Sequence, residues 1–106
     1  MLIIKQTGKM ARPKKRRRIN CRPSAYFFKP RGIPMFELEE ILLEDDELEA
    51  IRLADHQSLS HEDAAAKMKI SRATFGRIIH SARKKIADGI LNGKAIRISD
   101  TLKGKE

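Results

Sequence analysis

Cationic and polar side chains recur on one side of a predicted helix that begins at Arg72, opposite a row of apolar ones. The apolar row has the spacing of one helix face and consists of Phe75, Ile78, Ile79, Ala82 and Ile86. The opposite face carries Arg72, Ala73, Gly76, Arg77, His80 and Lys84, with Ser81 beside it. A helix fits the major groove of DNA, where one arginine can bind O6 and N7 of a guanine together. The pattern therefore predicts base recognition by Arg72, Ala73, Gly76, Arg77 and His80.

Gly76 needs an explanation of its own, because a glycine inside a helix costs about 1 kcal/mol relative to alanine. A close approach of the DNA backbone would account for it. Other residues near this helix are expected to contact phosphates, which adds affinity and salt dependence but reads no sequence. They are Lys69, Ser71, Thr74, Ser81, Arg83, Lys84 and Lys85.

Two helices in tandem must position this face. Ser60 is a good N-cap for a helix that runs to about Met68, with Asp63 at the third position of the capping box. Ser71 caps the next helix, which is expected to run from Arg72 to about Leu91. Asn92 and Gly93 then tolerate the left-handed conformation that ends helices.

The connection between these helices has the spacing of a helix-turn-helix. Ala65 is small where the two helices approach closely, and Ile70 is placed to act as a buried plug after the turn. Phe75 and Ile78 are expected to pack back onto the first helix of the pair. The turn position normally holds glycine in a left-handed conformation, so Lys69 there costs about 1 kcal/mol or more.

The elements around this pair are shorter. Leu48 and Ile51 recur at helical spacing after a run of acids, which predicts a further helix at about 45–56. Residues 25–28 are expected to be extended, residues 35–43 fit either a strand or the approach to a helix, and residues 95–99 alternate like a strand. The predicted fold is mainly α: a three-helix helix-turn-helix domain with a basic N-terminal arm and short extended segments at either end.

The 106 residues carry a net charge of +9, divided into three blocks. Residues 9–23 hold eight basic residues and no acid, residues 37–55 hold nine acids against Arg52, and residues 67–97 hold nine basic residues against Asp88. A surplus of this size attracts polyanions, of which nucleic acid is the commonest. The acidic block has two interpretations: a solvated helix face turned away from the polyanion, or a contact surface for a protein partner.

The basic arm also has two interpretations, a disordered solubilising tail or an arm that follows phosphates or enters the minor groove. We favour contact with DNA through Arg12, Lys14, Lys15, Arg16, Arg17 and Arg18. The domains are then a flexible arm at 1–24, a DNA-binding domain at 25–99 and a loose tail at 100–106. Residues 1–9 show no pattern, and Met10 is an alternative start.

Other classes of protein find little support. Cys21, His56, His61 and His80 lack the spacing of a metal site, and neither a phosphate-binding loop nor a catalytic group of Ser, His and acid stands out. We therefore expect no enzyme activity, metal or cofactor. Cys21 is either a bystander or a redox-sensing thiol with a lowered pKa. No apolar run spans a bilayer and no signal peptide is evident, so a cytoplasmic location is expected.

Several motifs resemble known families. Residues 43–87 look like the sigma-70 region-4 type of helix-turn-helix through Ser60-His-Glu-Asp-Ala-Ala-Ala, Ile70-Ser-Arg-Ala-Thr-Phe and Ser81-Ala-Arg-Lys-Lys-Ile. Residues 10–99 resemble the prokaryotic family called domain of unknown function 134, whose members are predicted DNA-binding proteins. That likeness is carried by Arg12-Pro-Lys-Lys, Phe28-Lys-Pro-Arg-Gly-Ile-Pro, Asp46-Glu-Leu-Glu-Ala-Ile-Arg-Leu-Ala-Asp, Ser71-Arg-Ala-Thr-Phe-Gly-Arg-Ile and Asn92-Gly-Lys-Ala-Ile-Arg-Ile. The resemblance implies a prokaryotic cytoplasmic regulator.

The expected function is therefore sequence-specific binding of double-stranded DNA by a transcriptional regulator. Two alternatives stay open: a sigma-like protein-interaction module using the acidic segment 37–55, and an RNA-binding protein using the basic arm. One helix-turn-helix buries little surface, so a homodimer with half-sites about 34–36 Å apart is expected. Residues 25–28, 35–43 and 95–99 are the candidate dimer contacts.

Overall fold

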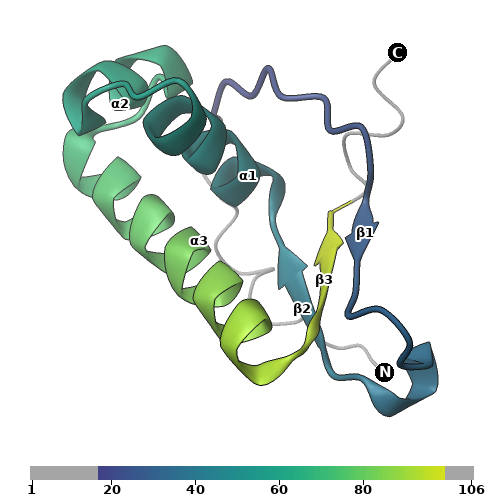
Figure 1. The fold of residues 1–106 in the computed structure, drawn as a ribbon. Helices are drawn as coiled ribbons and strands as arrows, with labels where there is room; N and C mark the ends of the chain where they lie inside the picture. Colours follow the sequence, from purple (N-terminus) through teal and green to yellow (C-terminus); the bar gives the residue numbers. More distant parts are fainter. Residues whose placement is uncertain (1–16, 100–106) are drawn as a thin grey trace, which may run out of the picture.

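A computed structural model describes residues 17–99, and the predictions for residues 1–16 and 100–106 lie outside this part of the chain. The elements in order are β1 (Phe27–Phe28), the 3-10 turn η2 (Met35–Glu37), β2 (Glu40–Leu43), α1 (Asp45–Ile51), the π-helical turn η3 (Arg52–His56), α2 (His61–Met68), α3 (Arg72–Asn92) and β3 (Ala95–Ile98) (Figure 1). The described part is a small, mostly helical domain with three helices and a three-stranded mixed sheet.

The ends of α2 and α3 are where the sequence signals placed them. The hydroxyl oxygens of Ser60 and Ser71 accept hydrogen bonds from the backbone N–H groups of Asp63 and Thr74, each at 3.0 Å. Gly93 ends α3 in the left-handed conformation at φ 65° and ψ 41°. These local signals work because the first N–H groups and last carbonyls of a helix lack partners within it.

The predicted helix at 45–56 is present, but it is α-helical only as far as Ile51 and π-helical from Arg52 to His56. Glu44 and Glu47 form a reciprocal capping box at the start of α1. From Arg52 the chain widens into the π-helical turn, and the N–H of Gln57 donates to the carbonyl of Arg52 at 2.9 Å. None of the helices among residues 17–99 is long and apolar enough to cross a membrane.

The ambiguous segment at 35–43 resolves into a 3-10 turn followed by a strand. β2 pairs in parallel with β3, and β1 pairs with the other edge of β3 in antiparallel fashion, so the order is β1-β3-β2. A parallel pair needs a long connection, and here α1, α2 and α3 together provide it. β3 is therefore the central strand, and only β1 and β2 keep a free edge among the described residues.

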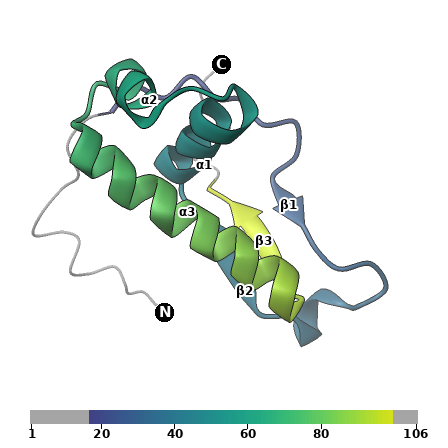
Figure 2. The ribbon, with the colours of Figure 1, turned by 60° about the vertical axis from the view of Figure 1, so that its left-hand side comes forward.

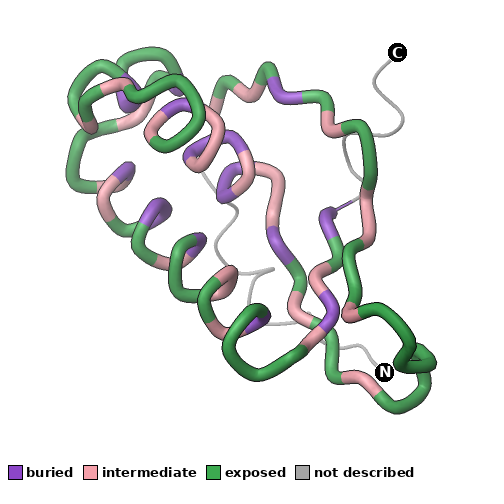
Figure 3. The backbone as a smooth tube through the Cα atoms, viewed as in Figure 1, coloured by how far each residue is buried: buried purple, intermediate pink, exposed green. Residues whose placement is uncertain are grey.

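Two groups of buried side chains hold the helices to each other and to the sheet. Phe75 and Ile79 of α3, with exposed fractions of 0 and 2%, pack against Leu53, Ala65 and Met68 of the preceding helices. Leu43 and Ile98 of the sheet pack against Ala82 of α3 in a second group. Figure 3 shows the buried residues gathered on the inner sides of the helices and strands. The predicted apolar face of α3 is confirmed, with Ile86 only partly buried.

Gly89 sets the distance between α3 and the sheet, which the sequence pattern did not reveal. A Cβ atom at this position would lie 2.9 Å from Cδ1 and 3.0 Å from Cγ1 of Ile96. Real Cβ atoms do not approach other atoms so closely, so a side chain at this position would require the side chain of Ile96 to shift. Figure 2 shows the last turns of α3 lying across the sheet.

Candidate nucleic-acid interface

The turn between α2 and α3 has the predicted left-handed residue. Lys69 adopts φ 59° and ψ 45°, and its N–H donates to the carbonyls of Ala65 and Ala66. The N–H of Ile70 donates to the carbonyl of Ala65 at 3.1 Å, and Ile70 packs partly buried against the core as the expected plug. The ring of His61 meets that of Phe75 edge-on with centroids 5.2 Å apart, which fixes the start of α2 against α3.

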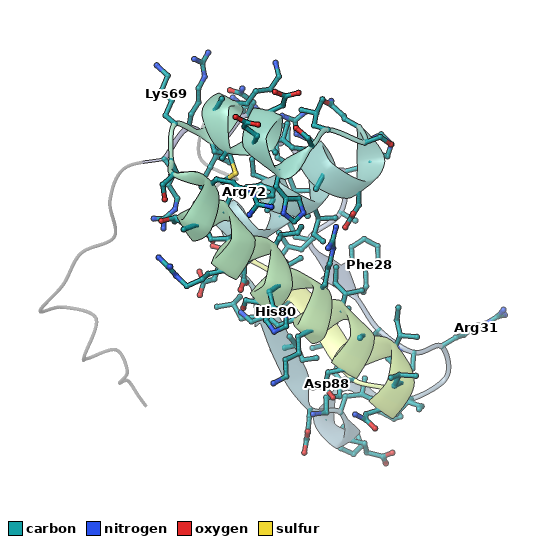
Figure 4. The ribbon with its side chains drawn as sticks, turned by 90° about the vertical axis from the view of Figure 1, so that its left-hand side faces the viewer. Phe28, Arg31, Lys69, Arg72, His80 and Asp88 are labelled. Atoms are coloured by element: carbon teal, nitrogen blue, oxygen red, sulfur yellow. The ribbon has the colours of Figure 1, made fainter. Side chains whose placement is uncertain are left out.

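The side chains predicted to read bases share one exposed surface, which we call the reading face. Arg72, Ala73, Arg77 and His80 are exposed and Gly76 is half-buried. Figure 4 shows Lys69 at the turn pointing away from the domain, Arg72 near the start of α3 and His80 further along the same helix. The Nη2 atom of Arg77 donates to the hydroxyl oxygen of Thr74 at 3.3 Å, and Arg77 is exposed.

Gly76 has no intramolecular reason to be glycine. A Cβ atom there would meet only Nη1 of Arg72, at 3.9 Å, which is an ordinary contact with a flexible side chain. Gly76 thus contrasts with Gly89, where a Cβ atom would press on the side chain of Ile96. The helix-propensity cost of Gly76, about 1 kcal/mol, is not recovered by packing within residues 17–99.

The nine basic residues of 67–97 fall into two groups. Arg83, Lys85, Lys94 and Arg97 form ion pairs with acids at 2.7 to 3.1 Å. The other five make no ion pair within 4 Å in the described part of the chain: Lys67, Lys69, Arg72, Arg77 and Lys84. The pKa of Asp88 is lowered mainly by hydrogen bonds from Asn92 and Lys94, and the charge of Lys84 lowers it further. The cations without an ion pair in this range are those of the last turn of α2, of the turn that follows and of the outer face of α3.

Three residues of α3 that were predicted to contact phosphates bind side chains elsewhere in the fold, while the hydroxyl groups of Ser71 and Thr74 bond each other at the start of the helix. Lys85 donates to Oε1 of Glu47 at 2.8 Å and to the carbonyl of Leu42 at 2.7 Å, and Ser81 donates to Oε2 of Glu47 at 2.6 Å. Arg83 makes a two-pronged pair with Asp55, at 2.7 and 3.2 Å. Both of those side chains are half-exposed, so this pair lies at the surface. Lys85 and Ser81, by contrast, face the sheet and α1.

Glu47 gathers three donors in a buried position. Burial by itself would raise the pKa of this carboxyl group, but hydrogen bonds from Lys85, Ser81 and the N–H of Glu44 outweigh it, and the net pKa is lowered. A buried carboxylate with this many donors stays ionised and holds α1, α3 and β2 together. Sequence spacing gave no signal for it, because Glu47 and Lys85 lie 38 residues apart.

The interpretation of the acidic segment as a solvated helix face is wrong for its central residues. Asp46, Glu47 and Glu49 are 4, 6 and 1% exposed. Glu49 binds Arg52 through two bonds of 2.9 Å and accepts a third, of 3.1 Å, from the N–H of Asn20. The physical reason is that buried carboxylates are tolerated when charged and polar donors surround them. The exposed part of the segment is at its two ends.

The described part of the basic arm lies against the helices. Nε of Arg17 is 3.4 Å from Oδ2 of Asp46, and the Arg17 side chain is only 13% exposed. The N–H of Arg18 donates to the carbonyl of Met68, beside the turn, while the Arg18 side chain is exposed. Arg17 thus has an acidic partner where a phosphate was predicted. Arg12, Lys14, Lys15 and Arg16 lie outside the described residues.

Cys21 occupies a buried position in the structure. Cys21 is 8% exposed, and burial, followed by the charge of Glu49, raises the pKa of its thiol, so the alternative of a thiol activated by cations is wrong. Within residues 17–99, no group of three or more His, Cys, Asp or Glu side chains is placed to hold a metal ion.

One residue of this surface was missed from the sequence. Lys67 is exposed in the last turn of α2, next to the turn that carries Lys69. Helical periodicity could have identified Lys67, because it lies on the face of α2 opposite the buried Ala64, Ala65 and Met68.

Comparison with known proteins identifies the family of this chain. The family model described as "Protein of unknown function DUF134" matches residues 7–104. The chain belongs to this family. The match confirms the resemblance drawn from the motifs and includes residues 7–9, which the motifs had left out. DUF134 membership names no activity, and the likeness to sigma region 4 is not addressed by it.

Similar proteins carry the designation UPF0251 protein. The one from Pelotomaculum thermopropionicum is 53% identical over 90 residues, covering 85% of this chain and 68% of that protein. Those from Desulfosudis oleivorans and Caldanaerobacter subterraneus subsp. tengcongensis are 54 and 55% identical over 89 residues, covering 84% of this chain and 64 and 75% of those proteins. The chain therefore spans about two thirds of the length of these DUF134 relatives. No solved structure matches it.

Proposed function

We propose that this protein binds double-stranded DNA in a sequence-specific way and acts as a transcriptional regulator. The observation that carries the proposal is the division of the basic residues of 67–97 into two groups. Arg83, Lys85, Lys94 and Arg97 are paired with acids, whereas those at the end of α2, on the turn and on the outer face of α3 form no ion pair within residues 17–99. A cation without a partner at one surface favours a polyanion there.

The α2–turn–α3 unit is the helix-turn-helix of this proposal. α3 enters the major groove with its first turns, since residues near the start of a recognition helix reach base edges. Arg72 and Arg77 carry guanidinium groups suited to guanine, and His80 lies further along the same face. Gly76 lets the helix backbone approach the DNA closely, which would account for a glycine that packing does not require.

The phosphates on either side are held by cations around the reading face. Lys69 and Lys84 keep this predicted role, and we add Lys67. Arg83 can bind a phosphate only if its ion pair with Asp55 breaks. Lys85 is bound to Glu47 and is not assigned to a phosphate. The basic residues from Arg12 to Arg16 precede Arg17 and Arg18, which lie next to α1 and the end of α2, so the arm starts close to the proposed DNA.

The experiment is selection of bound fragments from genomic DNA, with the affinity of the selected sequence measured against unrelated duplex. Arg72→Ala and Arg77→Ala are each expected to reduce affinity for the selected sequence by about 5- to 150-fold and to relax preference at one base pair. Arg97→Ala is the matched control, because Arg97 pairs with Glu40 at 2.9 Å on the sheet.

Three results would contradict the proposal. The first is an unchanged sequence preference in both arginine variants. The second is an equal loss in the Arg97→Ala control. The third is tighter binding of structured RNA than of any duplex DNA, which would favour the RNA-binding alternative.

A further inference from the structure

An apolar hollow opens at the end of α3 that is remote from the reading face. It measures about 330 Å³, and Phe28, Pro30, Ile90 and Ile96 line it together with Gly89 and Gly93. Phe28 and Ile90 expose 53 and 72% of their surfaces. Contiguous exposed apolar surface of this kind marks interaction sites in proteins.

The same end of the molecule also carries a protruding aromatic side chain. Phe36 of η2 is 86% exposed, and Met35 beside it is 45% exposed. Figure 1 shows η2 beyond the lower ends of β1 and β2, on the side where α3 ends and away from α2. One chain thus presents both an apolar hollow and an apolar side chain able to fill a hollow.

The charges around these two features are complementary. Lys29 and Lys94 both line the hollow. Lys94 is paired with Glu39 and Asp88 at 3.1 and 3.0 Å, whereas the ammonium group of Lys29 donates to the carbonyls of Pro30 and Ile33 without an acidic partner among residues 17–99. Glu37 directly follows Phe36, is exposed and has no cationic partner in that range. Arg31 extends into solvent from the same loop (Figure 4). A surface with both signs of charge can match a copy of itself.

We propose that this end is the contact surface of a two-fold dimer, with a second copy of the chain as the occupant. Phe36 of each copy fills the hollow between Phe28 and Ile90 of the other, and Glu37 of each faces Lys29 of the other. A two-fold contact requires this reciprocity, in which residue i meets j and j meets i. The surface keeps Phe28 from the predicted dimer segment 25–28 and Met35–Glu37 from the segment 35–43, and it adds the end of α3. β3 is the central strand and has no free edge to pair with a second copy, so the segment 95–99 contributes only Ile96, in the wall of the hollow.

The arrangement leaves both reading faces free. α3 has 21 residues and is about 31 Å long, so its first turns lie well away from the proposed contact. Two such helices on one DNA would read two half-sites. This consequence rests on the proposed function, whereas the dimer itself does not.

The test is sedimentation equilibrium of the full chain without DNA. The chain has a mass of 12.1 kDa, and the parent is expected to reach twice that mass as concentration rises. Phe36→Glu and Ile90→Glu are each expected to raise the dissociation constant of the dimer by about tenfold or more. Leu42→Glu is the matched control, because Leu42 is 44% exposed on the strand β2 and lies outside the hollow.

A monomeric parent at every concentration would overturn the proposal, and so would a dimer that both variants leave intact or that Leu42→Glu weakens equally. Circular dichroism and thermal unfolding of each variant confirm that a loss of mass reflects the surface and not the fold. Arg72→Ala is expected to leave the mass unchanged, so failure of the dimer and failure of DNA binding are separate outcomes.

Discussion

The hydroxyl group of Ser81 on α3 donates a hydrogen bond of 2.6 Å to Oε2 of Glu47, in the first turn of α1, 34 residues earlier in the chain. Lys85 donates to the other oxygen of the same carboxylate at 2.8 Å. Ser81 and Lys85 therefore belong to the polar residues of α3 that stabilise the domain. The polar residues on the outer face of the helix remain available to a ligand.

Replacing Glu47 tests the structural half of this division. Glu47→Gln keeps the shape but removes the charge from a buried site with charged and polar donors, so the free energy of unfolding is expected to fall by about 1–3 kcal/mol at neutral pH. The pKa of Glu47 is lowered in the folded state, so its contribution is complete above the ordinary value of 4.5 and is lost as pH falls through the folded-state value.

Denaturant unfolding at pH 7 and at a series of values below 4.5 measures this difference. The gap between parent and variant is expected to close toward the acid end, because a protonated Glu47 also lacks the charge. A gap that stays constant with pH would contradict the assignment. Glu40→Gln is a surface control, since Glu40 pairs with the half-exposed Arg97 and surface pairs contribute little.

Lys84 and Lys85 are neighbours that the structure separates by role. Lys84 is exposed without an ion pair, whereas Lys85 binds Glu47 and the carbonyl of Leu42. Lys84→Ala is expected to reduce the slope of log affinity for DNA against log salt by about 1 with little effect on stability. Lys85→Ala is expected to lower stability and leave the slope unchanged. The reverse pattern in filter-binding and unfolding measurements would show that Lys85 is the phosphate contact.

Gly76 and Gly89 form a second matched pair. Gly76→Ala has room for its Cβ, so it is expected to gain up to about 1 kcal/mol of stability while losing affinity for DNA. Gly89→Ala is expected to show no such gain and to lose stability, because its Cβ would press on Ile96. Thermal unfolding and a DNA titration of both variants provide the comparison. Full DNA affinity in Gly76→Ala would remove the reason for proposing a close approach there.

Lys69 tests the cost of the turn. Its left-handed backbone strains any residue with a Cβ, so Lys69→Gly is expected to raise the free energy of unfolding by about 1 kcal/mol. Lys69→Ala retains the Cβ and is expected to give no such gain. Chemical denaturation of the two variants separates backbone strain from the lost charge, and equal stabilities would argue against strain.

The local elements were predictable because their signals are local. Ser60, Ser71 and Gly93 cap helices through groups only a few residues away, and the row from Phe75 to Ala82 follows from helical periodicity alone. The left-handed turn at Lys69 followed from the spacing between Ala65 and Phe75. The outward position of the residues of the reading face was therefore predictable without tertiary information, and their contact with bases stays a prediction.

The partners of the charges were decided by the tertiary structure. Sequence proximity could not show that Glu47 would bury itself against Lys85, that Arg17 would lie beside Asp46, or that Glu40 and Arg97 would pair across 57 residues. A run of acidic residues in the sequence suggests a single charged surface. In the folded chain, however, each carboxylate binds the donors that lie nearest to it in space. For that reason the central carboxylates of the acidic segment are buried and bind donors from other elements.

By itself the sequence determined the capped helices, the turn and the outward face of α3, because hydrogen bonds and side-chain periodicity within a few residues are sufficient for them. Only the tertiary structure decided the order β1-β3-β2, the close contact at Gly89 and the hollow beside Ile90. Those features depend on pairing between segments up to 70 residues apart, from Phe27 to Arg97, and no local preference encodes which distant strand a strand will meet.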